Sequence, residues 1–164
     1  MKLCRLIYKS VATAEVVSNK TLRSLQDQAA AANAEAGITG LLVLAGNTFV
    51  QVLEGDAQRL TTLMGNIARD KRHRMVELIS FMPVAQRNFD AWNMRLIDLY
   101  DLPGDKRAYM VSKYGQSGEQ LIIPDDEQLL HALLIDARHL CLSLPWQSGP
   151  GSDGSADADE RTSA

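Results

Sequence analysis

The chain has 164 residues and a formal net charge of −3, with 46% hydrophobic and 23% charged residues. These values fit one globular domain with a short appendage. They exclude the strongly basic surface that nucleic acids and anionic membranes attract. No apolar run approaches the ~20 residues of a membrane-spanning helix, and the N-terminus lacks the apolar core of a signal peptide. We therefore expect a cytoplasmic protein with neither a nucleic-acid nor a membrane partner.

The cysteines and histidines form neither a disulfide framework nor a metal-binding pattern. Cys4 and Cys141 lie far apart in the chain. The three histidines, His73, His131 and His139, have no cysteine or carboxylate at ligand spacing. We expect two buried free thiols and no metal site.

The first third of the chain predicts a strand followed by a helix. Residues 3–8 favour a strand, and Thr21 is a candidate N-cap for the helix that follows. Gly37 is expected to end that helix. The apolar stripe of the helix consists of Leu22, Leu25, Ala29, Ala32 and Ala36.

A β-hairpin is predicted next, because two apolar runs flank the Gly46-Asn47 pair. Alternation places Phe49, Gln51 and Leu53 on one face of the second strand. The unbroken apolar run from 41 to 44 indicates that both faces of the sheet are covered.

Another helix and two further strands follow the hairpin. Gly55-Asp56 is a stop and a cap, and the helix is expected to end near Asp70. Its apolar residues are Leu60, Leu63, Met64 and Ile67. Residues 75–82 alternate like a strand, and Trp92, Met94 and Leu96 are predicted to share one face of a last strand.

The predicted fold class is α+β, a ferredoxin-like βαββαββ five-stranded mixed sheet. Right-handed crossovers place both helices on one face. A helix from about 125 to 144 is expected to cover the other face, so we predict a binding domain over 1–99, a helical cap over 100–146 and a disordered tail over 147–164. The stripe of the cap helix is Leu129, Leu130, Leu133, Leu134, Ala137, Leu140, Cys141 and Leu144.

Gln51 is the polar exception in a strand expected to be buried, so it needs a hydrogen-bond partner. Tyr8, at the end of the first strand, is a candidate. A cleft between the two helices, floored by this pair, has the profile of a ligand site. Its expected walls are Leu25, Asn33, Ile67 and the corner from Asp70 to Arg72.

Each of these residues also has an ordinary structural interpretation. Gln51 alone would be a satisfied core amide, and Tyr8 a half-buried aromatic. Asn33 alone would be a helix-end residue, and residues 70–73 a solvated helix terminus. Their joint order is what points to a shared site.

That order resembles the BLUF domains, a family of flavin-dependent blue-light sensors, over roughly residues 3–97. The matching residues are Arg5-Leu6-Ile7-Tyr8-Lys9-Ser10, Asn33, Gly37-Ile38-Thr39-Gly40-Leu41-Leu42, Phe49-Val50-Gln51-Val52-Leu53-Glu54-Gly55, Asp70-Lys71-Arg72-His73, Arg87 to Phe89, Trp92 and Met94.

The resemblance implies a flavin between the helices, usually FAD, with FMN and riboflavin as possible substitutes. Asn33 would bind the ring edge around N3 and the C4 carbonyl. Asp70 and Arg72 would contact the same pyrimidine side, and Leu25 and Ile67 would sandwich the ring. One departure is Ala32, where many relatives carry a polar or basic side chain; its effect would fall on binding or on dark recovery.

The resemblance also implies a photoactive group rather than catalytic residues. Tyr8 would supply an electron and a proton. Gln51 would rearrange by rotation, tautomerisation or both, since an amide can donate and accept hydrogen bonds. Trp92 and Met94 would exchange position near the glutamine, and the helix 125–144 would receive the signal.

The expected output is a light-dependent contact with a protein effector acting in trans, or with further copies in a homo-oligomer. An acylphosphatase-like hydrolase is the alternative on this fold, but residues 9–13 lack the glycines and arginine of a phosphate loop. An RNA-binding sheet would need exposed aromatics and a basic strand, which residues 49–54 do not provide.

Overall fold

The computed structural model describes residues 1–13, 19–115 and 121–143. Along the chain the elements are β1 (Leu3–Ala12), α1 (Asn19–Ala36), β2 (Thr39–Ala45), β3 (Thr48–Asp56), α2 (Ala57–Arg69), β4 (His73–Pro83), β5 (Arg95–Asp98), the short 3-10 helix η2 (Leu99–Asp101), α3 (Gly104–Tyr114) and α4 (Glu127–Ser143).

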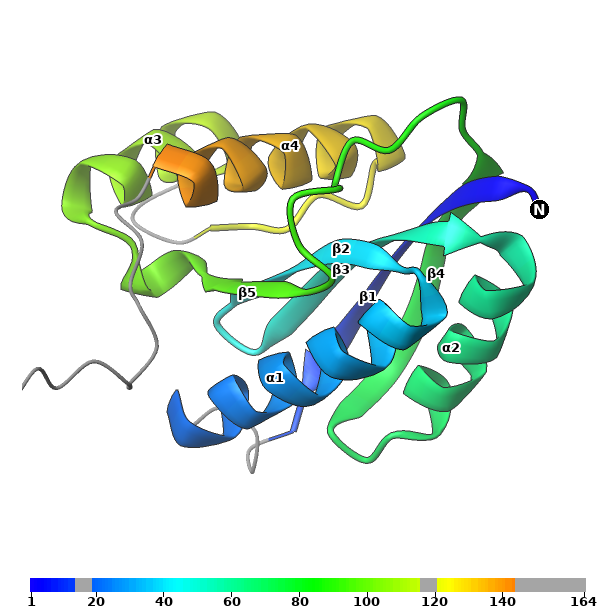
Figure 1. Ribbon diagram of the computed structural model, residues 1–164. Helices are drawn as coiled ribbons and strands as arrows, with labels where there is room; N and C mark the ends of the chain where they lie inside the picture. Colours follow the sequence, from blue (N-terminus) through cyan, green and yellow to red (C-terminus); the bar gives the residue numbers. More distant parts are fainter. Residues whose placement is uncertain (14–18, 116–120, 144–164) are drawn as a thin grey trace, which may run out of the picture.

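The five strands form one mixed sheet in the order β4-β1-β3-β2-β5 (Figure 1). The pairs β1–β3, β1–β4 and β2–β3 are antiparallel, and β2–β5 is parallel. The predicted ferredoxin-like α+β fold is confirmed.

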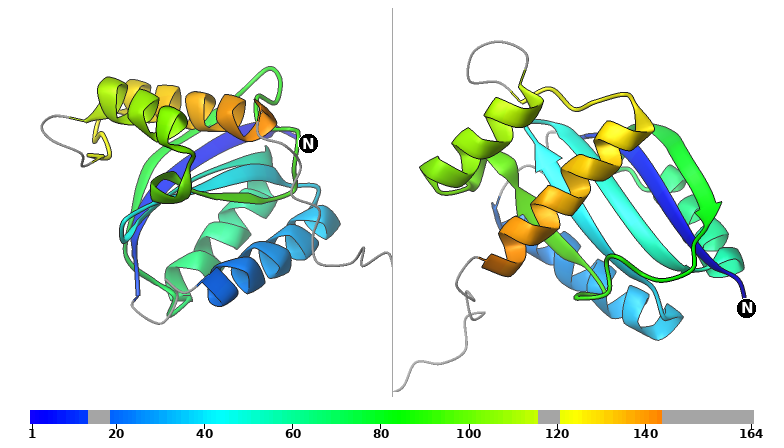
Figure 2. Two further views of the ribbon diagram at one scale, coloured as in Figure 1. Left: turned by 90° about the vertical axis from the view of Figure 1, so that its left-hand side faces the viewer. Right: turned by 90° about the horizontal axis from the view of Figure 1, so that it is seen from above.

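Helices cover both faces of the sheet, so the molecule has three layers (Figure 2). Helices α1 and α2 lie on one face and α3 and α4 on the other. Each face has its own apolar core. The core under α1 and α2, called here the cleft-side core, contains Leu6, Tyr8, Leu22, Leu25, Leu42, Phe49, Leu53, Leu60 and Met94. The core under α4, the cap-side core, contains Ile7, Leu41, Val43, Val50, Val52, Phe89, Ile97, Leu130, Leu133, Leu134 and Ala137.

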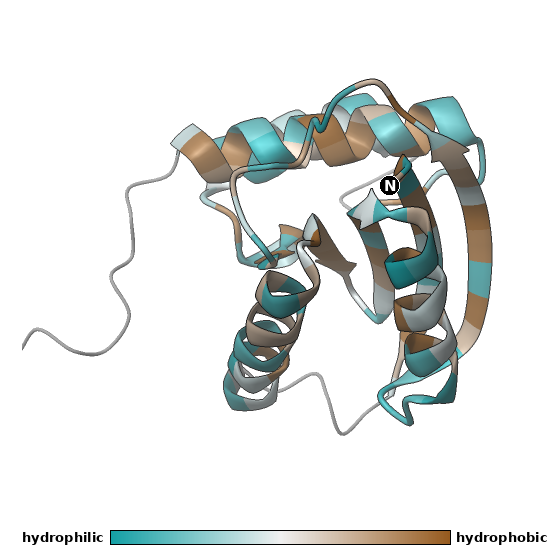
Figure 3. Cartoon of the chain, turned by 45° about the vertical axis from the view of Figure 1, so that its right-hand side comes forward, coloured by the Kyte–Doolittle hydropathy of each residue, from teal (hydrophilic) through white to brown (hydrophobic). Residues whose placement is uncertain are grey.

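The helices alternate between hydrophilic and hydrophobic segments, as elements with one buried side do (Figure 3). In α4 the predicted stripe is buried from Leu130 to Cys141. Leu129 is the exception, with 54% of its surface exposed. Leu144 and the predicted tail lie outside the described residues.

The predicted turns and caps of the first half are largely confirmed. Gly37 and Gly46 have φ angles of +65° and +63°, which only glycine adopts without strain. The Asp56 side chain caps α2 by accepting the backbone N–H groups of Gln58 and Arg59 at 3.1 and 3.4 Å. Thr21 was predicted as a cap, but α1 already includes Asn19, so Thr21 lies in its first turn.

The segment before β5 differs from the prediction. Trp92, Met94 and Leu96 were expected on one face of a strand, but β5 begins only at Arg95. The irregular backbone before it sends the two side chains to opposite faces of the sheet. Trp92 packs against the cap-side core, and Met94 lies in the cleft-side core.

The cap contains more structure than the single helix predicted. Helix α3 and η2 lie between β5 and α4. They went unpredicted because no apolar stripe marks α3, in which Met110 and Tyr114 are the buried residues. Both cysteines are free and buried, as expected. Among the described helices, none is long and apolar enough to cross a membrane.

Candidate functional site

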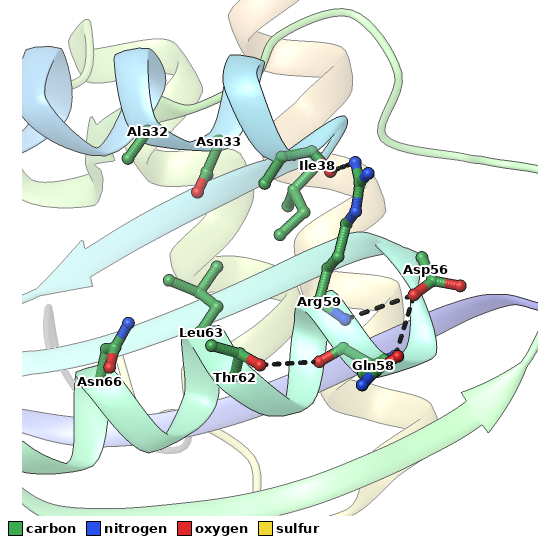
Figure 4. A pocket seen from close by; sticks show the side chains of 10 residues that line it. Ala32, Asn33, Ile38, Asp56, Gln58, Arg59, Thr62, Leu63 and Asn66 are labelled. Atoms are coloured by element: carbon green, nitrogen blue, oxygen red, sulfur yellow. Dashed lines mark hydrogen bonds between the residues drawn. The ribbon is translucent and has the colours of Figure 1, made fainter. Parts of the chain in front are cut away.

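A cleft of about 410 Å³ opens between α1 and α2 (Figure 4). This volume lies within the range of small-molecule sites, roughly 300–1,000 Å³. Its lining residues are Ala32, Asn33, Ala36, Ile38, Asp56, Gln58, Arg59, Thr62, Leu63 and Asn66. Arg59 reaches from α2 to the end of α1, where its Nη1 donates to the Ala36 carbonyl at 2.6 Å.

Tyr8 and Gln51 meet in the cleft-side core, as the sequence predicted. They are directly paired across β1 and β3. The Tyr8 hydroxyl donates to Gln51 Oε1, and Gln51 Nε2 donates to Met94 Sδ at 3.3 Å. Tyr8 is fully buried and Gln51 is 5% exposed. The amide therefore has both ends occupied, one by a phenol and the other by a thioether.

The surroundings of Tyr8 favour its neutral form. Burial, together with the negative charge of Asp70, raises the pKa of the phenol above its usual range. The His73 ring lies edge-on to Tyr8 at 6.1 Å between centroids, and its Nδ1 is 2.9 Å from Ser10 Oγ. Burial lowers the pKa of His73. The phenol is thus a poor acid but has polar neighbours.

Asp70 and Arg72 form a bidentate pair at the end of α2. Arg72 Nε and Nη2 donate to the Asp70 carboxylate at 3.0 and 2.6 Å. This hydrogen bonding to Arg72 lowers the pKa of Asp70. Arg72 Nη1 also donates to Gln28 Oε1 on α1 at 3.2 Å, so the pair connects the two helices.

Of the residues predicted to contact the flavin ring, Asn33 is the one that lines the cleft. It is 3% exposed, and its Nδ2 donates to the Asn93 carbonyl at 2.9 Å. Its side chain points between the helices with the oxygen at its free end (Figure 4). Within the described residues this oxygen accepts no hydrogen bond, so it can accept one from a ligand N–H group.

The other predicted contacts lie around the cleft rather than along its open part. Leu25 is 5% exposed and Ile67 packs against the same core. Trp92 lies on the far face and is not part of the cleft. Ala32 lines the cleft and is exposed at its edge. No group of three or more metal-ligating side chains occurs within the described ranges.

Sequence reasoning missed several polar contacts near the site. Gln28 contacts Arg72, Gln26 Oε1 accepts the Leu96 backbone N–H at 2.8 Å, and His73 packs beside Tyr8. Gln28 could have been predicted from helical spacing, because it lies one turn before Ala32, a position expected near the ligand. Nothing in the pattern marks the partner of Gln26, because Leu96 lies on a distant strand.

Fold and site together define a small ligand-binding domain with a buried phenol and a buried amide beneath its cleft. A family model described as sensors of blue-light using FAD, the BLUF family, matches residues 3–95. The chain belongs to the BLUF family, a family of blue-light sensors that bind flavin. The suspected family and its cofactor are confirmed.

Comparison with individual proteins agrees with this family match. The chain is 37% identical over 86 residues to photoactivated adenylate cyclase subunit alpha of Euglena gracilis, a match that covers 52% of this chain but 8% of that protein. Klebsiella pneumoniae BlrP1, solved with FMN and cyclic diGMP, is 32% identical with a TM-score of 0.61, covering 85% of this chain and 36% of that one. BlsA in its photo-activated state shares the fold with a TM-score of 0.70 at 21% identity, covering 89% and 99%.

Proposed function

We propose that residues 1–99 of this chain hold a flavin, usually FAD, between α1 and α2, and that residues 100–146 act as the output cap. The observation that carries the proposal is the Tyr8–Gln51–Met94 chain of contacts beneath the cleft. A bound flavin supplies blue-light absorption and, once excited, an electron acceptor.

The residues present fit such a cofactor. The free oxygen of Asn33 suits the N3–H of the ring, while Arg72 supplies donors for the neighbouring carbonyls. Leu25 and Ile67 offer apolar contact to a planar ring, and Gln51 can bond its polar edge. The Asp70–Arg72 pair keeps a net charge near zero beside the ring, since both groups are ionised and paired.

Tyr8 is the proposed electron and proton donor, and Gln51 the proposed switch. In the arrangement described here the phenol donates to the amide carbonyl. Tyr8 would give an electron to an excited acceptor beside it, and the phenol radical cation left behind, a strong acid, would release its proton toward Gln51. The amide can then present its other end, because its carbonyl and amino groups are close in shape.

Met94 and Trp92 are the proposed carriers of the signal to the other face. They are separated by one residue yet lie in different cores, so moving one is coupled to moving the other. We propose that the chain has no catalysis of its own and acts on an effector in trans, or through a homo-oligomer. Cyclase activity belongs to the Euglena protein, whose length this chain covers by 8%.

The test is the absorption spectrum of the purified protein in the dark and after blue light. We expect a yellow protein with a small, reversible red shift. A protein that stays colourless and refuses added FAD, FMN and riboflavin would contradict the proposal.

A further inference from the structure

Glu54 is a buried carboxylate on the face of the sheet opposite the cleft. It stands three residues after Gln51 on β3, and none of its surface is exposed. Its sheet partner is Arg5 on β1, whose Nε donates to Glu54 Oε1 at 2.8 Å. The Arg5 side chain is itself only 10% exposed. An ion pair this deep gains little net stability over an apolar pair, so a positional role is the better explanation.

The Glu54 carboxylate also binds backbone from a distant segment. The N–H groups of Asn88 and Phe89 donate to Glu54 Oε2, both at 2.9 Å. The Glu54 backbone carbonyl accepts from Arg87 Nη1 at 2.7 Å. Three successive residues of the β4–β5 connection are therefore held by one residue of β3.

The held segment, residues 87–94, leads directly to the switch. Beyond Phe89 the Trp92 carbonyl accepts from the Gly40 N–H at 3.0 Å, and Asn93 Nδ2 donates to the Ile38 carbonyl at 3.0 Å. The next residue is Met94, whose sulfur accepts from Gln51. Glu54 thus fixes the start of a segment whose end contacts the photoactive amide.

The contacts of Glu54 with Arg5, Asn88 and Phe89, called here the clamp, also reach helix α4 of the cap through the Phe89 ring. The Phe89 ring is 1% exposed and lies edge-on to the His131 ring of α4, with centroids 6.1 Å apart. The Arg5 guanidinium lies 5.9 Å from the centre of that Phe89 ring. A shift of residues 87–94 would therefore be felt at α4 through Phe89.

We propose that Glu54, paired with Arg5, is a positioning residue that fixes residues 87–94 and so sets how fast Met94 and Trp92 return after light. The inference rests on the proposed photoreceptor function. It predicts that weakening the clamp leaves the dark Tyr8–Gln51 contact intact and lowers the barrier for repacking the segment.

The test compares Glu54→Gln with the parent chain, both loaded with FAD and both carrying Trp146→Phe so that Trp92 is the one tryptophan. Glutamine keeps the shape but loses the charge that strengthens the N–H bonds. We expect the flavin and the red shift to remain, dark recovery to speed up about tenfold, and the light-induced change in Trp92 fluorescence to shrink. Recovery within about twofold of the parent, with unchanged Trp92 emission, would overturn the proposal.

Two further variants keep the outcome decisive. If Glu54→Gln fails to fold, the double variant Arg5→Met, Glu54→Gln removes both buried charges together, and unchanged recovery there would equally overturn the proposal. Asp136→Asn is the matched control, because it removes the charge from the contacts that Asp136 makes with Lys113 and Tyr114 at 2.7 and 2.6 Å without touching residues 87–94. Equal acceleration in this control would show general loosening and also overturn it.

Failure of this inference and failure of the proposed function give different results. Without any red shift in the parent chain, the photoreceptor function itself fails. With a normal shift in the parent and normal recovery in the variants, only the role of Glu54 fails.

Discussion

At the scale of single residues, the most informative side chain is Gln51, because its two ends face chemically different partners. The carbonyl accepts a strong hydrogen bond from a phenol, whereas the amino group has the weak acceptor of Met94. Exchanging the two ends therefore changes the bonding of both neighbours. A residue with one kind of polar end could not do this.

Replacing Gln51 tests this directly. Gln51→Leu keeps the volume and the apolar contacts but cannot form either hydrogen bond, so we expect normal flavin content and complete loss of the red shift. Difference absorption spectroscopy measures this. The control is Gln128→Leu, the same change at an exposed position of α4, which should shift normally. A normal shift in Gln51→Leu would refute the switch role.

At the scale of elements, the β2–β3 pair fixes the site, and Gly40 is its tightest point. A Cβ at Gly40 would lie 2.3 Å from the Val52 carbonyl oxygen, which real Cβ atoms do not approach. Because Val52 belongs to the strand that carries Gln51, Gly40→Ala would push β3 away from β2 and disturb the position of Gln51 opposite Tyr8.

We expect Gly40→Ala to lower the free energy of unfolding by at least about 2 kcal/mol, measured by urea titration. Gly104→Ala is the control, since nothing lies within 4 Å of a Cβ there, and its change should stay within about 0.5 kcal/mol. Equal stability of Gly40→Ala and the parent would show that the strands can separate without loss.

The elements also show what could be predicted from sequence. The hairpin and the Asp56 cap follow from local chemistry, because turns and caps act over a few residues. Tyr8 and Gln51 lie 43 positions apart, and the joint order of the matched residues, rather than strand alternation, points to them as partners. The faces of Trp92 and Met94 do not, since strand alternation fails where the backbone is irregular. The roles of Glu54 and Arg5 were hidden as well. Both lie in matched motifs, but apart from its pair with Arg5 the Glu54 carboxylate contacts backbone groups of residues 88 and 89, which carry no side-chain signal.

At the scale of the whole molecule, each face of the sheet has one half-buried histidine beside it. On the cleft side the ring of His73 faces Asp70 and Arg72. On the cap side His131 faces Arg5, Glu54 and Glu127, and its Nε2 is buried without a partner in the described part of the chain. Burial is the main cause that lowers the pKa of both rings.

The direction of the resulting pH dependence follows from proton counting. Unfolded histidines titrate near pH 6.5, whereas the half-buried rings of His73 and His131 stay neutral to lower pH. Below about pH 6.5 the unfolded chain therefore binds more protons than the folded one, and the free energy of unfolding falls as the pH drops. The fall continues until the folded pKa values are reached, and it amounts to at most about 1.4 kcal/mol per pH unit for each histidine. The pKa of Asp70 is lowered, so its contribution to folding stability is lost only as the pH falls below the usual value of 3.8.

Urea unfolding of the FAD-loaded protein between pH 7.5 and pH 5 isolates this effect. We expect a plateau at the upper end and a decline below about pH 6.5. His131→Gln should remove part of the decline, because a neutral amide has no proton to gain. His139→Gln, at an exposed position of the same helix, should leave it unchanged. A flat profile for the parent would mean that both half-buried rings accept a proton without loss of stability, and it would contradict this prediction.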